Sequence, residues 1–341
     1  MASRIGACFT MKGILPQGMS VVTLLYPRPM TTEITRSSIE EAASRIGPHL
    51  RRTPVVDLGP VLGGRHRVSL KLDSMQPTGS FKVRGAFSAL TAMSVPEVGV
   101  VAASGGNFGL AVAYAAARLD HRATVFVPAT SPEEKVGRIA GYGAEVRVVP
   151  GYYLEALEES RRWAADSGAL EVHAFDQPEV VAGQGTCGME IMEQEPGVTT
   201  ILVAVGGGGL IGGIASWVRD GATLVAVEPE KCPTLYSARQ EGRPVDVEVG
   251  GVAASALGAS RLGELAWAAN KWVDRSLLVS DEAILDSQRW LWETCRVLAE
   301  PAACAPIAAL LIGAYAPGPD ERLVVVISGA NTAGLPPGSP E

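Results

Sequence analysis

The sequence predicts an α/β protein built from open, doubly wound parallel sheets that helices cover on both faces. Three observations support this fold class. Short apolar runs rich in valine and isoleucine alternate along the chain with longer amphipathic segments. Strands that are apolar on both faces are typical of parallel sheets buried between helices. The chain has 341 residues, more than one small core needs, so we expect two lobes.

The elements follow in chain order. Thr35 and the residues of the next turn predict a helix that ends near Ile46, ahead of Pro48. The strands we expect after it are 68–72, 99–103, 123–127, 145–149, 200–205, 223–227 and 323–327. Helical spacing predicts helices over 110–119, 153–166, 211–218 and 281–298, and one that begins at about Phe87.

Composition argues against several classes of partner. A net charge of −7 and an isoelectric point near 5.3 indicate neither a nucleic acid nor an anionic membrane surface as partner. No segment reaches the roughly 18–20 uninterrupted apolar residues of a membrane span. The five cysteines and four histidines are scattered without ligand spacing, so we expect reduced thiols and no transition-metal site.

Residues 1–30 predict a disordered leader and not a signal peptide. Lys12, Gly13 and Pro16 interrupt the apolar run that a signal peptide would need. We therefore expect a cytoplasmic protein whose folded body begins near residue 31.

Ligands of open α/β sheets bind beyond the carboxyl ends of the strands, so the loops after the strands are the candidate site. The first of these loops carries Lys82 within Gln76-Pro77-Thr78-Gly79-Ser80-Phe81-Lys82-Val83-Arg84-Gly85-Ala86. A lysine at the mouth of a crevice can form an imine, and partial burial would lower its pKa. A surface lysine with an apolar stem is the alternative.

The second loop, Ser104 to Gly109, follows strand 99–103. Its glycines allow backbone amides to face a substrate carboxylate, and the following helix N-terminus adds positive potential. Asn107 could donate a hydrogen bond to a cofactor oxygen. A simple strand-to-helix turn is the alternative.

The third loop is a run of four glycines, Gly206 to Gly209, before Leu210. Backbone without side chains can wrap a phosphate closely. The pattern G-x-G-x-x-G with a later acid, Glu228, also fits a dinucleotide site, so a nicotinamide enzyme stays open here. A fourth loop begins with Ser328, whose hydroxyl could be the neutral partner of a cofactor ring nitrogen. An ordinary Ser-Gly turn is the alternative.

Taken together, the four loops resemble those of fold-type II pyridoxal-phosphate enzymes, and among these the threonine/serine dehydratases (ammonia-lyases). The resemblance spans roughly residues 35–331, and the lysine loop is its most specific part. Other dehydratase-like segments are His173-Ala174-Phe175-Asp176, Ala182-Gly183-Gln184-Gly185-Thr186, Val227-Glu228-Pro229-Glu230 and Glu300-Pro301. A nicotinamide enzyme would leave the lysine loop unexplained.

The resemblance implies a tryptophan synthase β-like fold, with a large domain from 31–100 and 183–335 and a small domain from 101–182. It implies a homodimer that acts on a small amino acid and releases a 2-oxo acid and ammonia. Lys82, the Schiff-base lysine, and Ser104 would be catalytic. Cofactor contacts would come from Phe81, Lys82, Asn107, Gly206, Gly207, Gly208, Gly209, Leu210 and Ser328. Substrate contacts would come from Ser80, Ser104, Gly105, Gly106 and Asn107.

Several positions depart from the family pattern Ser-Ser-Gly-Asn-His. Gly105 replaces the second serine, which in racemases returns a proton to the opposite face, so racemisation is not expected. Phe108 replaces the histidine and suggests a larger or more apolar substrate. Ala303 and Ala330 stand where glycines are usual and would crowd the cofactor.

The resemblance also bears on a cation. Glu228 and Cys232 align with two ligands of cation-binding members, but Thr234 stands where they have Asp. We expect no metal, although a cation near Glu228 stays open.

Two other functions stay open beside the dehydratase. One is β-replacement or another lyase reaction on a larger β-substituted amino acid. The other is a catalytically silent binding or scaffold protein, which the full set of cofactor motifs makes less attractive.

Overall fold

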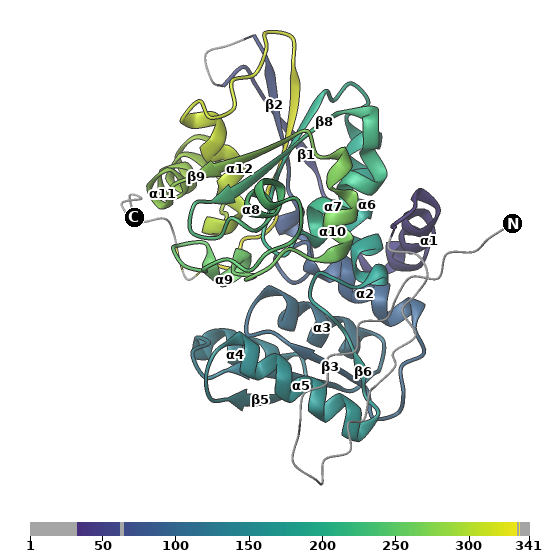
Figure 1. The fold of residues 1–341 in the computed structure, drawn as a ribbon. Helices are drawn as coiled ribbons and strands as arrows, with labels where there is room; N and C mark the ends of the chain where they lie inside the picture. The colour runs from purple at the N-terminus through teal and green to yellow at the C-terminus, as the bar shows by residue number, and fades with distance from the viewer. Residues whose placement is uncertain (1–32, 62–64, 333, 335–341) are drawn as a thin grey trace, which may run out of the picture. The chain divides into compact units, whose positions relative to one another are not determined.

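The computed structural model of the chain describes residues 33–61, 65–332 and 334 (Figure 1). The predicted leader, residues 1–30, lies outside the described residues. Among the described residues the strands form two sheets, a six-stranded sheet in the order β1-β2-β10-β7-β8-β9 and a four-stranded sheet in the order β5-β4-β3-β6.

The strands are β1 Val55–Gly59, β2 Arg67–Lys71, β3 Val100–Ala103, β4 Ala123–Pro128, β5 Glu145–Val149, β6 Leu170–Glu171, β7 Thr200–Ala204, β8 Thr223–Pro229, β9 Arg275–Val279 and β10 Arg322–Val326. The helices are α1 Arg36–Ile46, α2 Lys82–Ala92, α3 Asn107–Arg118, α4 Glu133–Gly141, α5 Tyr153–Ser167, α6 Pro178–Gln194, α7 Gly209–Val218, α8 Thr234–Glu241, α9 Ala254–Leu257, α10 Glu264–Ala269, α11 Asp281–Trp290 and α12 Pro301–Leu311. Short 3-10 turns, such as Asp73–Met75 before the lysine loop, connect some of them.

The larger sheet is parallel except for β1, which pairs antiparallel with β2 at one edge. Successive side chains of a strand point to opposite faces. Leu202 and Val225 accordingly pack with α11 and α12, whereas Ile201 and Leu224 pack with α6, α7 and α10. Both faces are therefore buried by helices, as the apolar strands predict.

The smaller sheet is parallel throughout. Val100 and Val125 pack with α2 and α3 on one face, and Val101 and Phe126 pack with α5 on the other. Figure 1 shows α4 and α5 beside β5 and β6 of this sheet. The predicted α/β class with covered parallel sheets is confirmed.

The boundaries of several helices differ from the prediction. The helix expected at about Phe87 begins at Lys82, and α3 begins at Asn107 and not at residue 110. Neither helix has a side-chain cap, so no capping signature marks its start in the sequence. The helix expected over 281–298 ends at Trp290 and continues as a π-helical turn, Leu291–Cys295.

Three strands were not predicted. The edge strand β1 and the strand β9 are only partly buried, and β6 has two residues, so none carries the continuous buried apolar run of β3 or β7. None of the described helices is long and apolar enough to cross a bilayer.

Candidate active site

The loops that follow β2, β10 and β7 meet because these strands are neighbours in the larger sheet. A cavity lies at this edge, and the residues predicted to contact the cofactor line it: Phe81, Lys82, Asn107, Gly206, Gly207, Gly208, Gly209, Leu210 and Ser328. Phe175, Leu257 and Glu300 are among the further lining residues. The structure thus brings together residues from segments that lie far apart in the chain.

Lys82 is the first residue of α2, and its side chain lines the cavity between two aromatic rings. Its Nζ lies 5.1 Å from the centre of the Phe81 ring and 5.7 Å from that of Phe108. It donates a hydrogen bond to the Ala174 carbonyl at 3.0 Å. Burial lowers the pKa of Lys82 to about 8, against the opposing effect of the Glu300 carboxylate. A larger fraction of the amine is therefore neutral near pH 7 than for an exposed lysine.

The glycine run has no room for side chains. A Cβ on Gly206 would lie 2.8 Å from Leu257 Cα, and one on Gly209 would lie 2.9 Å from the Phe175 carbonyl oxygen. Gly208 has a φ of +87°, which favours glycine, and it precedes α7 directly. The loop is a backbone cradle at a helix N-terminus, which suits a phosphate group.

The residues of the cavity match the chemical groups of pyridoxal phosphate. The glycine cradle can hold its phosphate, the Lys82 amine can react with its aldehyde, and the Ser328 hydroxyl on the same cavity can face its ring nitrogen. The donor set therefore fits. The Phe175 ring lies against Gly207 and forms part of the cavity wall.

Asn107 belongs to a buried polar network that crosses from α3 to the ends of β10 and α12. Its Nδ2 donates to Glu300 Oε1 at 2.7 Å, and its Oδ1 accepts from Asn331 Nδ2 at 2.8 Å. Arg138 of α4 donates to Asn331 Oδ1 at 2.9 Å. The amide of Asn107 is thus oriented by two partners, and its second N–H is left for a ligand.

Glu300 is a site residue to which the sequence assigned no role. Burial raises its pKa to about 7, while the hydrogen bond from Asn107 and the charge of Lys135 act in the opposite direction. The only sequence signal was its place in the dehydratase-like pair Glu300-Pro301. Its contact with Asn107 spans 193 residues and could not be read from spacing.

The predicted substrate residues other than Asn107 do not line this cavity. Ser104 Oγ accepts from the Gly106 amide at 3.2 Å and so shapes the turn before α3. The Ser80 hydroxyl is buried and has no hydrogen-bond partner among the described residues. Ala303, predicted to crowd the cofactor, packs into the core of the larger sheet, whereas Ala302 lines the cavity.

Glu228 lies away from the cavity wall and caps α8. It accepts from the amides of Leu235 and Tyr236, both at 2.7 Å, and from the Ser276 hydroxyl at 3.2 Å. The Thr234 hydroxyl lies 3.1 Å from Glu228 Oε1 and 2.5 Å from the Gly206 carbonyl oxygen. Glu228 is therefore engaged as a helix cap, and the dinucleotide interpretation loses its ribose-binding acid.

In the part of the chain that the structure describes, no group of three His, Cys, Asp or Glu side chains is arranged to hold a metal ion.

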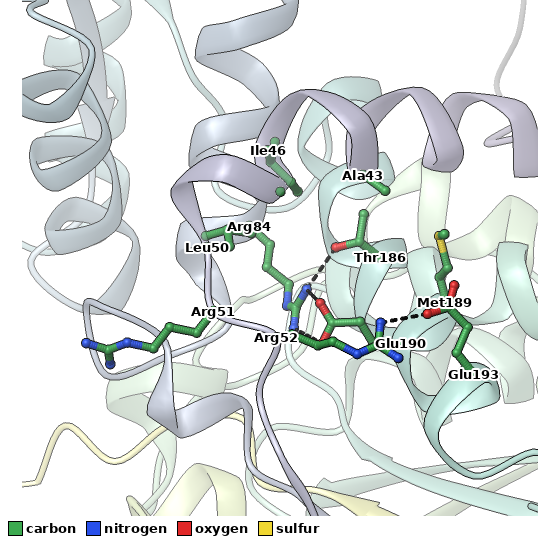
Figure 2. Close-up of a pocket in the computed structure, with 11 residues that line it drawn as sticks. Ala43, Ile46, Leu50, Arg51, Arg52, Arg84, Thr186, Met189, Glu190 and Glu193 are labelled. Atoms are coloured by element: carbon green, nitrogen blue, oxygen red, sulfur yellow. Dashed lines mark hydrogen bonds and ion pairs between the residues drawn. The ribbon is translucent and has the colours of Figure 1, made fainter.

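Arg84, two residues after Lys82, anchors the other side of α2. It forms ion pairs with Asp73 at 2.6 Å and Glu190 at 2.7 Å, and it donates to Thr186 Oγ1 at 3.1 Å. Figure 2 shows Arg84 reaching between Thr186 and Glu190 at a second cavity of about 200 Å³. Because Arg84 and Glu190 are engaged with each other there, their role is to hold α2 against α6.

Comparison with known proteins shows which family the chain belongs to. The family model described as pyridoxal-phosphate dependent enzyme matches residues 46–329. The chain is 35% identical over 307 residues to the L-threonine ammonia-lyase of Thermotoga maritima, and the match covers 87% of this chain and 76% of that protein.

Solved structures of enzymes with related names are similar to this chain over most of its length. The threonine deaminase of T.th. is 34% identical, with a TM-score of 0.82 and coverage of 90% of this chain and 100% of that one. Maize serine racemase is 29% identical, with a TM-score of 0.82 and coverage of 88% of this chain and 94% of that one.

Proposed function

Because this chain belongs to the family of pyridoxal-phosphate dependent enzymes, we propose that it is an ammonia-lyase acting on a serine- or threonine-like amino acid. The reaction eliminates water between Cα and Cβ, and hydrolysis then releases a 2-oxo acid and ammonia. The observation that carries the proposal is that the half-buried Lys82 lines the same cavity as the glycine cradle and has a lowered amine pKa. The likeness to L-threonine ammonia-lyase and threonine deaminase supports the substrate class.

Each of the residues proposed to contact the cofactor would bind a different part of it. Gly206, Gly207, Gly208, Gly209 and Leu210 would hold the phosphate, Phe81 would pack against the ring, Asn107 would donate to the 3'-oxygen attached to the pyridine ring, and Ser328 would face the ring nitrogen. When bound, pyridoxal phosphate withdraws the electron pair that removal of the α-proton leaves behind.

The proton is moved by Lys82. With a pKa of about 8, its amine can be neutral at mildly alkaline pH and can take the α-proton of the substrate. A hydroxyl such as that of Ser328 leaves a ring nitrogen uncharged, unlike a carboxylate. A less electron-deficient ring favours prompt departure of the β-hydroxyl over transamination.

The substrate carboxylate would bind at the turn Ser104, Gly105, Gly106 and Asn107, where α3 begins without a side-chain cap. The buried and unpartnered Ser80 hydroxyl is a further donor for the substrate. These assignments rest on the position of the turn after β3 and on the family resemblance.

A second candidate is a lyase or β-replacement reaction on a larger β-substituted amino acid. Phe108 favours it, because its ring lies 5.7 Å from Lys82 Nζ and makes the surroundings of the amine apolar. A panel of β-hydroxy and bulkier β-substituted amino acids separates the two reactions by the amount of 2-oxo acid released.

We also propose a cytoplasmic homodimer with the small domain at 101–182. The cysteines in the described part of the chain are all free, which is typical of a reducing compartment. Sedimentation equilibrium of the purified protein tests the dimer.

The cofactor assignment is tested by the visible spectrum of the purified protein, followed by borohydride reduction and peptide mapping. We expect an absorption band that Lys82→Ala abolishes and a phosphopyridoxyl label on Lys82. Lys271→Ala, at an exposed lysine, should leave both unchanged. A label absent from Lys82 would contradict the proposed mechanism.

A further inference from the structure

The space beside Gly105 is filled by a side chain from another segment. A Cβ built on Gly105 would overlap Ser131 Oγ and would lie 2.8 Å from Ser131 Cβ. Contacts this short are essentially absent between real side chains. Only one of the two positions, 105 or 131, can therefore place a side chain in this space, and in this chain it is Ser131.

The topology explains how the two residues meet. β3 and β4 are parallel neighbours, with Ala103 opposite Phe126, so the turns that follow them lie at the same edge of the smaller sheet. Ser131 closes the turn after β4 by donating its amide to the Pro128 carbonyl at 2.9 Å. Its side chain is thereby held against the turn that we propose binds the substrate carboxylate.

The segment after Ser131 faces the active site. Arg138 of α4 bonds Asn331, which in turn bonds Asn107. The charge of Lys135 opposes the rise in the pKa of Glu300 that burial causes. The half-buried Ser131 hydroxyl has no hydrogen-bond partner among the described residues. A free donor therefore lies beside the Ser104–Asn107 turn, on a segment whose Lys135 and Arg138 also act on residues of the site.

We propose that Ser131 supplies a hydroxyl that binds the substrate carboxylate, in place of a side chain at position 105. This inference rests on the proposed function, because it places the carboxylate at the Ser104–Asn107 turn. Ser131 is then a substrate-binding residue contributed by the turn after β4, and the pair of positions 105 and 131 determines how the carboxylate is held.

The test uses the holoenzyme and four variants: Ser131→Ala, Gly105→Ser, the double variant Gly105→Ser with Ser131→Gly, which removes both the Oγ and the Cβ at position 131, and Thr130→Ala. Thr130 is the matched control, since its replacement removes a hydroxyl from the exposed part of the same turn. Binding of L-alanine, which has no β-leaving group, is followed by the change in the cofactor absorption. KM and kcat for L-serine and L-threonine are measured in parallel, and thermal unfolding reports whether each variant is folded.

We expect Ser131→Ala to weaken L-alanine binding by about tenfold, the loss of one hydrogen bond to a charged group. KM should rise by a similar factor while kcat changes little. Gly105→Ser should be worse than Ser131→Ala because the two side chains overlap. The double variant should recover most of the affinity, because a hydroxyl returns to the same space from the other position.

Two results would overturn the inference: unchanged L-alanine binding in Ser131→Ala, or a double variant no better than Gly105→Ser. A holoenzyme that binds L-alanine but converts neither serine nor threonine would contradict the proposed function alone, and the binding series would still decide the role of Ser131. A holoenzyme whose spectrum responds to no amino acid would contradict both.

Discussion

Lys82 and Glu300 occupy one buried environment, and each influences the ionisation of the other. Burial lowers the pKa of the Lys82 amine to about 8 and raises that of the Glu300 carboxyl to about 7. The Glu300 charge acts against the first shift and favours the protonated amine. Among single residues, Glu300 is therefore the one whose charge opposes the lowering of the Lys82 pKa, and Asn107 donates a hydrogen bond to its carboxyl group.

Replacing Glu300 tests this coupling. Glu300→Gln removes the negative charge, so the pKa of Lys82 should fall further, by about one unit. The measurement is the pH dependence of Lys82 modification by an amine-reactive reagent in the cofactor-free protein, read by mass spectrometry. Glu293→Gln, at an exposed carboxylate, should leave the midpoint unchanged. An unshifted midpoint in Glu300→Gln would show that the charge does not reach Lys82.

Thr234 supports the glycine run, which we propose holds the cofactor phosphate, by a hydrogen bond to Gly206. Its hydroxyl lies 2.5 Å from the Gly206 carbonyl oxygen and within reach of the Glu228 carboxyl. Thr234→Val keeps the shape of the side chain and removes the donor, so we expect pyridoxal phosphate to bind about tenfold more weakly. Thr234→Ser, which keeps the hydroxyl, should bind it nearly as well as the unmodified protein. Equilibrium titration with the cofactor measures both, and equal losses in the two variants would point to packing alone.

Among the secondary-structure elements, α2 carries the lysine on one side and a buried ion network on the other. Arg84 pairs with Glu190 (Figure 2) and with Asp73, and Lys71 pairs with the same Glu190 at 2.6 Å. Because Asp73 and Arg84 are both buried, neither can be hydrated if its partner is lost. The network therefore holds the start of α2, and with it Lys82, in one position against α6.

Removing Arg84 should accordingly be costly. Arg84→Met leaves Asp73 without its buried cation, and we expect the free energy of unfolding to fall by about 3–5 kcal/mol in urea titrations. Arg52→Met breaks an ion pair with Glu193 whose side chains are 56% and 43% exposed, and it should cost less than about 1 kcal/mol. Similar losses in the two variants would argue against the anchoring role of Arg84.

For the molecule as a whole, the buried ionisable groups predict how stability depends on pH. The pKa values of Glu228 and Glu300 are raised from 4.5 to about 7, so between these values the folded chain holds protons that the unfolded chain has released. These two carboxyl groups therefore make stability fall as the pH rises from about 4.5 to 7, whereas the single His173, whose pKa burial lowers from 6.5, acts in the opposite direction below that pH. Lys82 has the opposite effect, because its lowered pKa means that stability is regained between about 8 and 10.5.

We thus expect a minimum in the free energy of unfolding near pH 7–8 for the cofactor-free protein. Each glutamate should contribute about 3 kcal/mol to the fall, as an order of magnitude. Urea unfolding at about pH 5, 6, 7, 8 and 9 measures the profile. Glu300→Gln should flatten its acidic limb, and a free energy that rises between pH 5 and 7 would refute the prediction.

The amino-acid sequence was sufficient to establish the fold class and the family, and it named the main residues that line the candidate cofactor cavity. Those features depend on short-range information: apolar runs that must be strands buried on both faces, glycines that leave backbone amides free, and a lysine within a specific local motif. The parallel topology then requires the loops after neighbouring strands to meet, which is why the lysine loop, the glycine run and Ser328 could be assigned to one cavity before it was seen.

Contacts between distant segments became visible only in the folded chain. Glu300 meets Asn107 across 193 residues, Thr234 reaches the Gly206 carbonyl, and Ser131 fills the space beside Gly105. No spacing or period in the sequence encodes such contacts, because each depends on how two separately formed turns pack at one sheet edge. The first residues of α2 and α3 could not be predicted either, because neither helix begins with a capping side chain that the sequence would show.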